Sequence, residues 1–147
     1  MGEQQGSDLR LSHFGVCVTD LERSLRFYCD GLDFEKAEGF DVGNEYGPSL
    51  EVDGDVRLRS QFIRRQDIAI ELMEYQSPGT IGEPSQHRNQ VGLTHLSFYV
   101  DDLDGAIARL VQFGGSVIER TRADNPGIAL IFCADPDGTR VELMKQG

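Results

Sequence analysis

The sequence has few cysteines and lacks a long hydrophobic run, and both absences narrow the classes of protein to which it can belong. Its three cysteines are an odd number without a Cys-x-x-Cys spacing, so neither a disulfide framework nor a thiolate zinc site is indicated. No apolar stretch approaches the roughly 18 residues that a transmembrane helix requires, and the N-terminal residues lack the basic-then-apolar layout of a secretory signal. A cytoplasmic location is therefore the default expectation.

Positive charge is also scarce. The chain has 14 Lys and Arg against 25 Asp and Glu, which gives a formal net charge of −11. Such a charge repels nucleic acids and anionic membrane surfaces, so neither is an expected partner. With 147 residues, of which 39% are hydrophobic, the chain can form one compact domain with its own core, or two small modules that share one.

The chain does contain an internal repeat. Leu11-Ser12-His13 returns 82 residues later as Leu93-Thr94-His95, and Glu71-Leu72-Met73 returns 71 residues later as Glu142-Leu143-Met144. The order along the chain is thus His, Glu, His, Glu, with one pair in each half. Duplicated halves can bring equivalent strands together about a pseudo-twofold axis, so two imidazoles and two carboxylates could converge on one divalent cation.

Both halves show the same order of elements, a strand followed by a helix and three more strands. In the first half, the patterns predict strands at 9–18, 33–40, 56–63 and 67–75, and a helix that begins at a Thr19–Glu22 capping box and ends at Gly31. In the second half, they predict strands at 92–100, 116–121, 127–134 and 139–144, and a helix at 103–113 capped by Asp101 or Asp102.

These elements define the expected domain plan. Residues 1–8 are a frayed tail, 9–75 form the first βαβββ module, 76–90 form a linker with Pro and Gly, and 91–146 form the second module. The expected fold class is α+β, with the tandem βαβββ modules forming a curved, mostly antiparallel sheet around a cleft. Because side chains alternate across a strand, the residues that share a face with the four repeated His and Glu are expected to line a substrate site. These residues are Cys17, Met73, Tyr75, Ser97, Tyr99 and Arg140.

A purely structural role is the alternative for the repeated residues. Any one of them, taken alone, is more often a structural or surface residue than a metal ligand. His13 with Glu71, and His95 with Glu142, could be buried hydrogen-bonded pairs inherited through duplication. Their joint placement in otherwise apolar strands favours metal binding, because an unpaired buried charge costs several kcal/mol and a bound cation removes that cost.

The tandem plan and the four repeated residues resemble the vicinal oxygen chelate superfamily. The similarity extends to the segments 19–28 and Asp135-Pro136-Asp137-Gly138, and it covers about residues 9–146. The resemblance implies a metal site formed by His13, Glu71, His95 and Glu142, which would bind two neighbouring oxygens of a substrate or of its enolate. It also implies a homodimer. The donor types admit nickel, cobalt, zinc, manganese or iron.

Members of the superfamily differ in their ligand sets. Extradiol dioxygenases use two histidines and one glutamate around iron(II), whereas glyoxalase I enzymes use two histidines and two glutamates, so the presence of Glu71 favours the second group. The glutathione contacts of bacterial glyoxalase I are replaced here, since Cys17 stands at the usual arginine and Tyr75 at the usual asparagine. The run 70–78 resembles methylmalonyl-CoA epimerase instead, although that enzyme has glutamine at the ligand position of Glu71.

The implied activity is that of a metal-dependent glyoxalase-like lyase, isomerase or epimerase that stabilises the enolate of a small carbonyl or thioester substrate. Either Glu142 or Glu71 would act as the catalytic base by leaving the metal. An extradiol-type dioxygenase is an alternative. A second alternative is a non-catalytic protein that binds small molecules, as bleomycin-resistance proteins do, although such proteins generally lack the complete ligand set.

Overall fold

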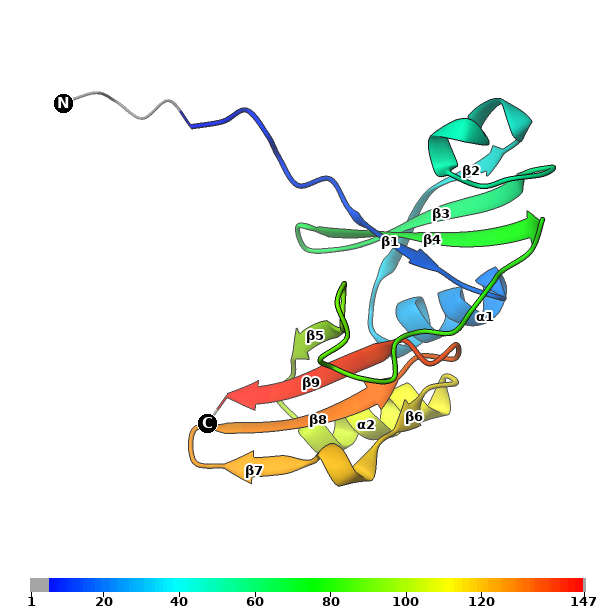
Figure 1. The fold of residues 1–147 in the computed structure, drawn as a ribbon. Helices are drawn as coiled ribbons and strands as arrows, with labels where there is room; N and C mark the ends of the chain where they lie inside the picture. The colour runs from blue at the N-terminus through cyan, green and yellow to red at the C-terminus, as the bar shows by residue number, and fades with distance from the viewer. Residues whose placement is uncertain (1–5, 147) are drawn as a thin grey trace.

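The computed structural model describes residues 6–146, which fold into two β-sheets with helices packed against them (Figure 1). The first half comprises β1 (Phe14–Cys17), α1 (Leu21–Leu25), the π-helical turn η1 (Arg26–Gly31), β2 (Glu35–Val42), the 3-10 turns η2 (Asn44–Tyr46) and η3 (Pro48–Leu50), β3 (Arg57–Arg65) and β4 (Ile68–Ser77). The second half comprises β5 (Leu96–Tyr99), α2 (Leu103–Gln112), β6 (Ser116–Val117), the 3-10 turn η4 (Glu119–Thr121), β7 (Ala123–Asn125), β8 (Ile128–Ala134) and β9 (Arg140–Gln146).

The two sheets have matching strand orders. Sheet A has the order β1-β4-β3-β2, and sheet B has the order β5-β9-β8-β6, with β7 also paired to β8. In each sheet the first strand of the module pairs in parallel with the last one, β1 with β4 and β5 with β9, and the other pairings are antiparallel. The predicted α+β class, with tandem βαβββ modules and mostly antiparallel sheets, is confirmed. Both β1 and β5 are edge strands.

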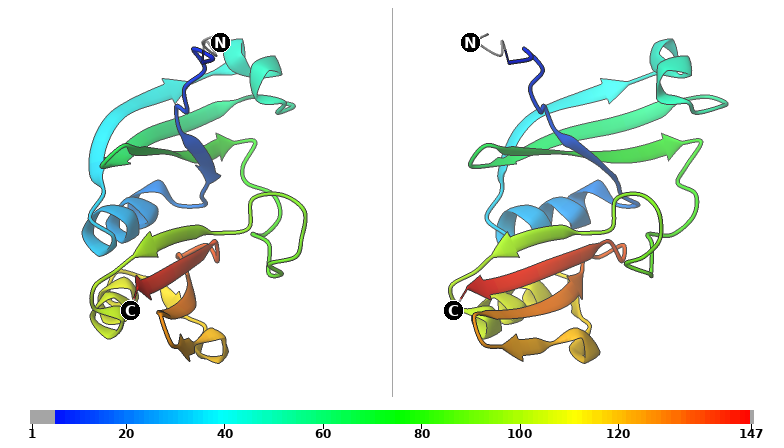
Figure 2. Two further views of the ribbon diagram at one scale, coloured as in Figure 1. Left: turned by 90° about the vertical axis from the view of Figure 1, so that its left-hand side faces the viewer. Right: turned by 60° about the vertical axis from the view of Figure 1, so that its left-hand side comes forward.

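One hydrophobic core joins the two modules, and α1 lies between the two sheets (Figure 2). The largest buried side chains of this core come from the helical segments and from both sheets: Phe27, Tyr28, Ile63, Ile70, Leu72, Leu110, Ile131, Val141 and Leu143. Ile70 and Leu72 flank Glu71 on β4, and Val141 and Leu143 flank Glu142 on β9. Because side chains alternate along a strand, both glutamates point to the opposite sheet faces, away from the core.

A buried hydrogen bond also links the modules. The Tyr28 hydroxyl donates to Asp135 at 2.8 Å, and Asp135 accepts from the backbone amides of Asp137 and Thr139 as well. The pKa of Asp135 is raised, because the effect of burial exceeds the lowering by these three hydrogen bonds. Burial beside Asp135 and Asp137 raises the pKa of the Tyr28 hydroxyl well above its usual value, so the hydroxyl remains a donor at neutral pH.

The start of the first helix differs from the prediction. The helix begins after Asp20, whose carboxylate accepts from the Arg23 amide at 3.0 Å. Thr19 does not form the predicted capping box with Glu22, because its hydroxyl and amide both donate to Asp137, 118 residues further along the chain. Asp102 caps α2 through the Gly105 amide, which is one of the two predicted residues.

Strand lengths also differ from the prediction. The predicted strand 9–18 forms only between Phe14 and Cys17, and the predicted strand 116–121 shortens to two residues followed by a 3-10 turn. Of the predicted tail 1–8, residues 1–5 lie outside the described part of the chain, and residues 6–8 are exposed. Across residues 6–146, none of the helices has the length and apolar character needed to cross a membrane.

Candidate metal centre

The first predicted pair of ligands lies on sheet A. His13 immediately precedes β1, and β1 pairs with β4 so that Gly15 stands opposite Glu71. The His13 Nε2 atom lies 3.5 Å from the Glu71 Oε1 atom. The Ser60 hydroxyl donates to the other carboxylate oxygen at 2.5 Å, and the Phe62 ring packs edge-on against the imidazole with 4.8 Å between centroids. The pair is thus held in place by neighbouring side chains of β3.

The second predicted pair lies on sheet B and repeats this geometry. The His95 Nε2 atom lies 3.7 Å from the Glu142 Oε1 atom. The Ser97 hydroxyl donates to Glu142 at 2.7 Å, and Phe132 packs edge-on against the His95 ring with 5.0 Å between centroids. Duplication has therefore preserved a local arrangement of imidazole, carboxylate and phenylalanine, and not only the two residues visible in the sequence repeat. The two serines are not equivalent, because Ser60 lies on β3 and Ser97 lies on β5.

Each imidazole is oriented by the hydroxyl of the preceding residue. The Ser12 hydroxyl lies 2.7 Å from Nδ1 of His13, and the Thr94 hydroxyl lies 2.6 Å from Nδ1 of His95. When Nδ1 carries the proton and donates to the hydroxyl, Nε2 presents a lone pair toward the carboxylate. Hydrogen bonds of this kind to the outer nitrogen commonly orient histidines that bind metals.

The spacing within each pair suits a shared cation. Two ligands at roughly 2.1 Å from one metal stand about 3.0 Å apart at octahedral angles and about 3.4 Å apart at tetrahedral angles. The observed nitrogen–oxygen separations of 3.5 and 3.7 Å exceed a hydrogen bond and are close to these values. Both histidine side chains are about one-third exposed, at 32% and 29%, so an ion could reach them from solvent.

A single chain brings the four predicted ligands together as two pairs, but it does not bring the pairs together. Among residues 6–146, no three side chains of the His, Cys, Asp and Glu types lie close enough to hold one metal ion. The pairs belong to different sheets, and each occupies the sheet face turned away from the shared core. Each pair alone is therefore half of the predicted ligand set.

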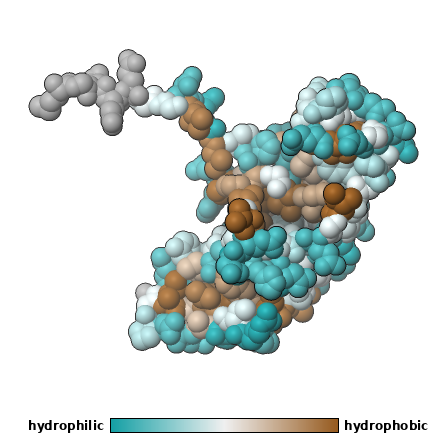
Figure 3. Space-filling model, viewed as in Figure 1, coloured by the Kyte–Doolittle hydropathy of each residue, from teal (hydrophilic) through white to brown (hydrophobic). Residues whose placement is uncertain are grey.

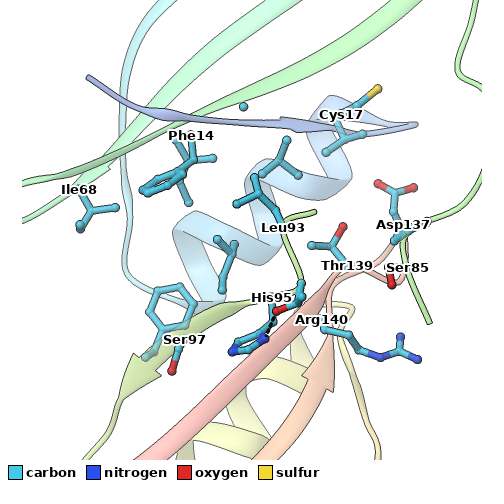
Figure 4. Close-up of a pocket in the computed structure, with 18 of the residues that line it drawn as sticks. Phe14, Cys17, Ile68, Ser85, Leu93, His95, Ser97, Asp137, Thr139 and Arg140 are labelled. Carbon is cyan, nitrogen blue, oxygen red and sulfur yellow. Dashed lines mark hydrogen bonds between the residues drawn. The ribbon is translucent and has the colours of Figure 1, made fainter. Parts of the chain in front are cut away.

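Four of the predicted substrate-lining residues border one groove. This groove, of about 970 Å³, lies between the edge strands β1 and β5 and is also lined by residues 80–85 (Figure 4). Cys17, Ser97, Tyr99 and Arg140 line it, together with His95. Burial and the nearby Asp137 carboxylate raise the pKa of the Cys17 thiol, which keeps it protonated and a poor nucleophile at neutral pH.

The other two predicted lining residues, Met73 and Tyr75, lie on β4 outside the lining of this groove. Met73 lies on the face of Gly15, because a Cβ atom added to that glycine would stand 3.5 Å from the methionine sulfur. Burial, and then the charges of Cys17 and Glu71, raise the pKa of Tyr75. Tyr75 therefore belongs to the surroundings of the first pair rather than to the groove.

Sequence reasoning did not identify the residues that support the four predicted ligands. Ser60, Phe62 and Phe132 come from strands without a recognisable repeat, and only strand register places them beside the histidines and glutamates. The orienting hydroxyls did leave a signal, because Ser12 and Thr94 each precede a histidine in the repeated tripeptides. A hydroxyl residue before both histidines was thus a readable feature of the duplication.

Comparisons with known proteins support the fold and indicate a family. The model of the Glyoxalase/Bleomycin resistance protein/Dioxygenase superfamily matches residues 10–143. The uncharacterized protein YaeR of Escherichia coli (strain K12) is 33% identical over 93% of this chain and 96% of its own length. Lactoylglutathione lyase of Schizosaccharomyces pombe is 28% identical over 95% of this chain, which corresponds to 48% of the yeast enzyme. The crystal structure of a glyoxalase family protein from Bacillus cereus has the same fold, with a TM-score of 0.82, 18% identity and 99% coverage of both chains.

Proposed function

Because the chain belongs to the Glyoxalase/Bleomycin resistance protein/Dioxygenase superfamily, we propose that it is a metal-dependent lyase or isomerase that stabilises the enolate of a small carbonyl or thioester substrate. The observation that carries the proposal is the pair of matching His–Glu arrangements, one on each module. Two structural ion pairs would not need the same hydroxyl on Nδ1 and the same edge-on phenylalanine against the imidazole. A ligand set explains both, since each contact orients a metal-binding atom.

The complete site in this proposal forms between two copies of the chain. Both β1 and β5 are edge strands with one side unpaired in a single chain, and each directly follows a ligand histidine. If β1 of one copy lies beside β5 of the other, the strand order becomes β4-β1-β5-β9 across the subunit boundary. His13 and His95 then stand on neighbouring strands, which are about 5 Å apart in a sheet.

The two glutamates then lie on the outer strands of this group of four. Glu71 already reaches His13 across one strand spacing, and Glu142 already reaches His95 in the same way. Joining the two edges therefore assembles all four ligands without changing either module. Twofold symmetry produces a second, equivalent site from the remaining edges, so a homodimer has two sites.

Exposed apolar side chains support the pairing of edges between copies. Leu9 and Leu11 precede β1 and are 82% and 71% exposed, and Leu93 precedes β5 and is 79% exposed. Figure 3 shows hydrophobic residues along the N-terminal arm and at the centre of the molecule. Contiguous exposed apolar surface commonly marks an interface, and open sheet edges pair readily with another chain.

The chemistry follows from the donor set. A divalent cation held by His13, Glu71, His95 and Glu142 supplies Lewis acidity toward the substrate oxygens. The serine hydroxyls hold one oxygen of each glutamate in place. Either glutamate can accept the proton removed from the carbon beside the carbonyl, because each lies beside a ligand histidine and accepts a serine hydroxyl. The phenylalanines packed on the imidazoles cover one side of the site and limit access of water.

A dioxygenase that uses three protein ligands is the second candidate from the same scaffold. It would require His13, His95 and Glu142, and it would leave Glu71 without a role. The Ser60 hydroxyl, however, holds Glu71 at 2.5 Å, which is as close as the contact that holds Glu142. Glu71 is thus held beside its histidine by a hydroxyl, as Glu142 is, and this favours the four-ligand site and therefore the lyase or isomerase.

Metal analysis of the purified protein tests the proposal. Wild-type protein should retain about one divalent ion per chain after dialysis, and Glu71→Gln should lose most of it, as should Glu142→Gln. Glu74→Gln is the matched control, because Glu74 lies on the same strand and contacts the Leu21 amide outside the site. Retention of metal by Glu71→Gln together with loss by Glu142→Gln would support the three-ligand dioxygenase. A wild-type chain that binds no divalent ion would refute both functions.

A further inference from the structure

Two arginines stand close together beside the second pair of ligands. The Arg88 guanidinium donates to the backbone carbonyls of Ser85 and Thr94, and Thr94 directly precedes His95. Arg140 lies two residues before Glu142 on β9 and donates to the carbonyl of Gly138 at 2.9 Å. The two residues that hold Arg88, Ser85 and Thr94, line the same groove as Arg140.

Neither arginine has an acidic partner within residues 6–146. Five other arginines in the same stretch form ion pairs with carboxylates: Arg23, Arg59, Arg64, Arg109 and Arg122. The nearby Asp137 is occupied by Arg23 and by Thr19. Several other arginines of this stretch also lack an ion pair, so what distinguishes Arg88 and Arg140 is their shared position beside the groove. Arg140 lines the groove, and Arg88 is held by the carbonyls of Ser85 and Thr94, which line it as well.

The two groups retain most of their hydrogen-bonding capacity. A guanidinium has five N–H donors, and the structure uses two of those on Arg88 and one on Arg140. Planar guanidinium groups bind carboxylates and phosphates through two parallel hydrogen bonds, which suits an anionic group with several oxygens. The backbone contacts hold both side chains in place before any anion arrives.

Arg140 is placed to meet a substrate rather than the bulk solvent. Its side chain is half-buried and lines the groove with His95, and it extends from β9 in a direction away from the imidazole (Figure 4). Arg140 shares a strand face with Glu142, and residues two apart on a strand are separated by about 7 Å. In one substrate molecule, an anionic group bound by Arg140 would therefore be only a few covalent bonds away from the atoms that contact His95 and Glu142.

We propose that Arg140 and Arg88 form a binding site for an anionic group, a carboxylate or a phosphate, carried by the substrate. The identity of the carrier as a substrate rests on the proposed function, whereas the anion site itself does not require metal. The site selects small substrates that present a carbonyl to the metal ligands and a negative charge to the two arginines. It also compensates locally for the net charge of −11, which otherwise repels anionic substrates.

The test uses the full-length, metal-free protein with inorganic phosphate and, separately, acetate as probes at constant ionic strength. The Nε–Hε signals of the arginine side chains are followed by NMR. The Arg140 signal should shift along a saturable curve with at least one of the two anions, and the anion that saturates it identifies the class. Arg140→Gln should abolish saturation at the Arg88 signal, and Arg140→Lys should weaken it about tenfold, because lysine lacks the planar fork.

Arg57→Gln is the control for charge, since Arg57 is exposed on β3 and makes no side-chain hydrogen bond or ion pair within residues 6–146. Saturation should be unchanged in this variant. Two results would overturn the proposal. One is an arginine NMR shift that rises linearly, without saturation, with the concentration of both anions. The other is an equal loss of the shift in the Arg57 and Arg140 variants. Metal binding is measured on samples of the same preparations. A wild-type protein that binds metal but not the anions refutes only the anion site. A wild-type protein that binds an anion but no metal refutes only the proposed function.

Discussion

Mixing two inactive variants tests whether two chains build each metal site. His13→Ala removes an imidazole from the first module, and His95→Ala removes one from the second. Each substitution deletes a ligand, which should weaken metal binding by more than the roughly 10- to 100-fold loss seen for changes in supporting residues. Dimers of either variant alone then hold no metal at a limiting concentration, because both of their sites lack one histidine.

A dimer that contains one chain of each variant behaves differently. In the arrangement β4-β1-β5-β9 across the subunit boundary, one site combines the two alanines and the other combines the two intact histidines. Random pairing of equal amounts makes about half of the dimers mixed, so about a quarter of all sites are complete. Metal bound per chain after co-expression and dialysis should therefore rise from near zero to about a quarter of the wild-type value.

A second mixture supplies the control. Wild-type chains paired with the double variant that carries both His13→Ala and His95→Ala give mixed dimers in which each site lacks one histidine. If each site is shared between two chains, only the wild-type dimers bind metal, and the mixture should hold about a quarter of the full metal content. If each site lies within one chain, every wild-type chain binds metal, and the mixture should hold about half. A half value here, together with no recovery in the first mixture, would refute assembly between subunits.

Three further predictions concern the support of the site and the stability of the fold. Ser60→Ala should lower metal affinity about tenfold, measured by competition with a chelator, because Glu71 loses the hydroxyl that orients it. Leu143→Ala should lower the free energy of unfolding in urea by about 2–5 kcal/mol, since this side chain is fully buried in the core shared by both modules. Burial, with a smaller effect of Glu119, raises the pKa of the Cys133 thiol from 9.0 to about 11. As the pH rises from 9 to 11, the unfolded chain therefore loses this proton before the folded chain does, and the free energy of unfolding falls. Cys133→Ala should show a shallower loss of stability between pH 9 and 11, and an identical slope in both proteins would contradict this reasoning.

The sequence was sufficient to predict the order of elements and the class of fold, because the repeat and the local patterns are both written along the chain. It was less informative wherever a distant residue competes for a local group. Thr19 and Glu22 have the spacing of a capping box, yet Asp137 binds Thr19 and Asp20 caps the helix instead. No local pattern could indicate that competition, because it depends on how the two modules pack.

The same limit applies to the candidate site. The tripeptide repeats identified the two pairs, and alternation along β4 and β9 correctly separated the core side of each strand from the side that bears the glutamate. Which sides of the two sheets meet is decided by the shared core and by α1, and neither is visible in the repeat. The sequence left open whether one chain or two build the site. The convergence of all four ligands stays a prediction, although both His–Glu pairs are present in one chain.

The hydrogen bond between Tyr28 and Asp135 joins a helical turn of the first module to the turn before the last strand of the second. It is a buried contact between the two halves, whose ligand pairs lie on different sheets. Neither pair can rotate toward the other without breaking a contact buried in the interior. In the proposed dimer, a second molecule supplies the missing donors, and the interior of each subunit would then set the separation between the two sites.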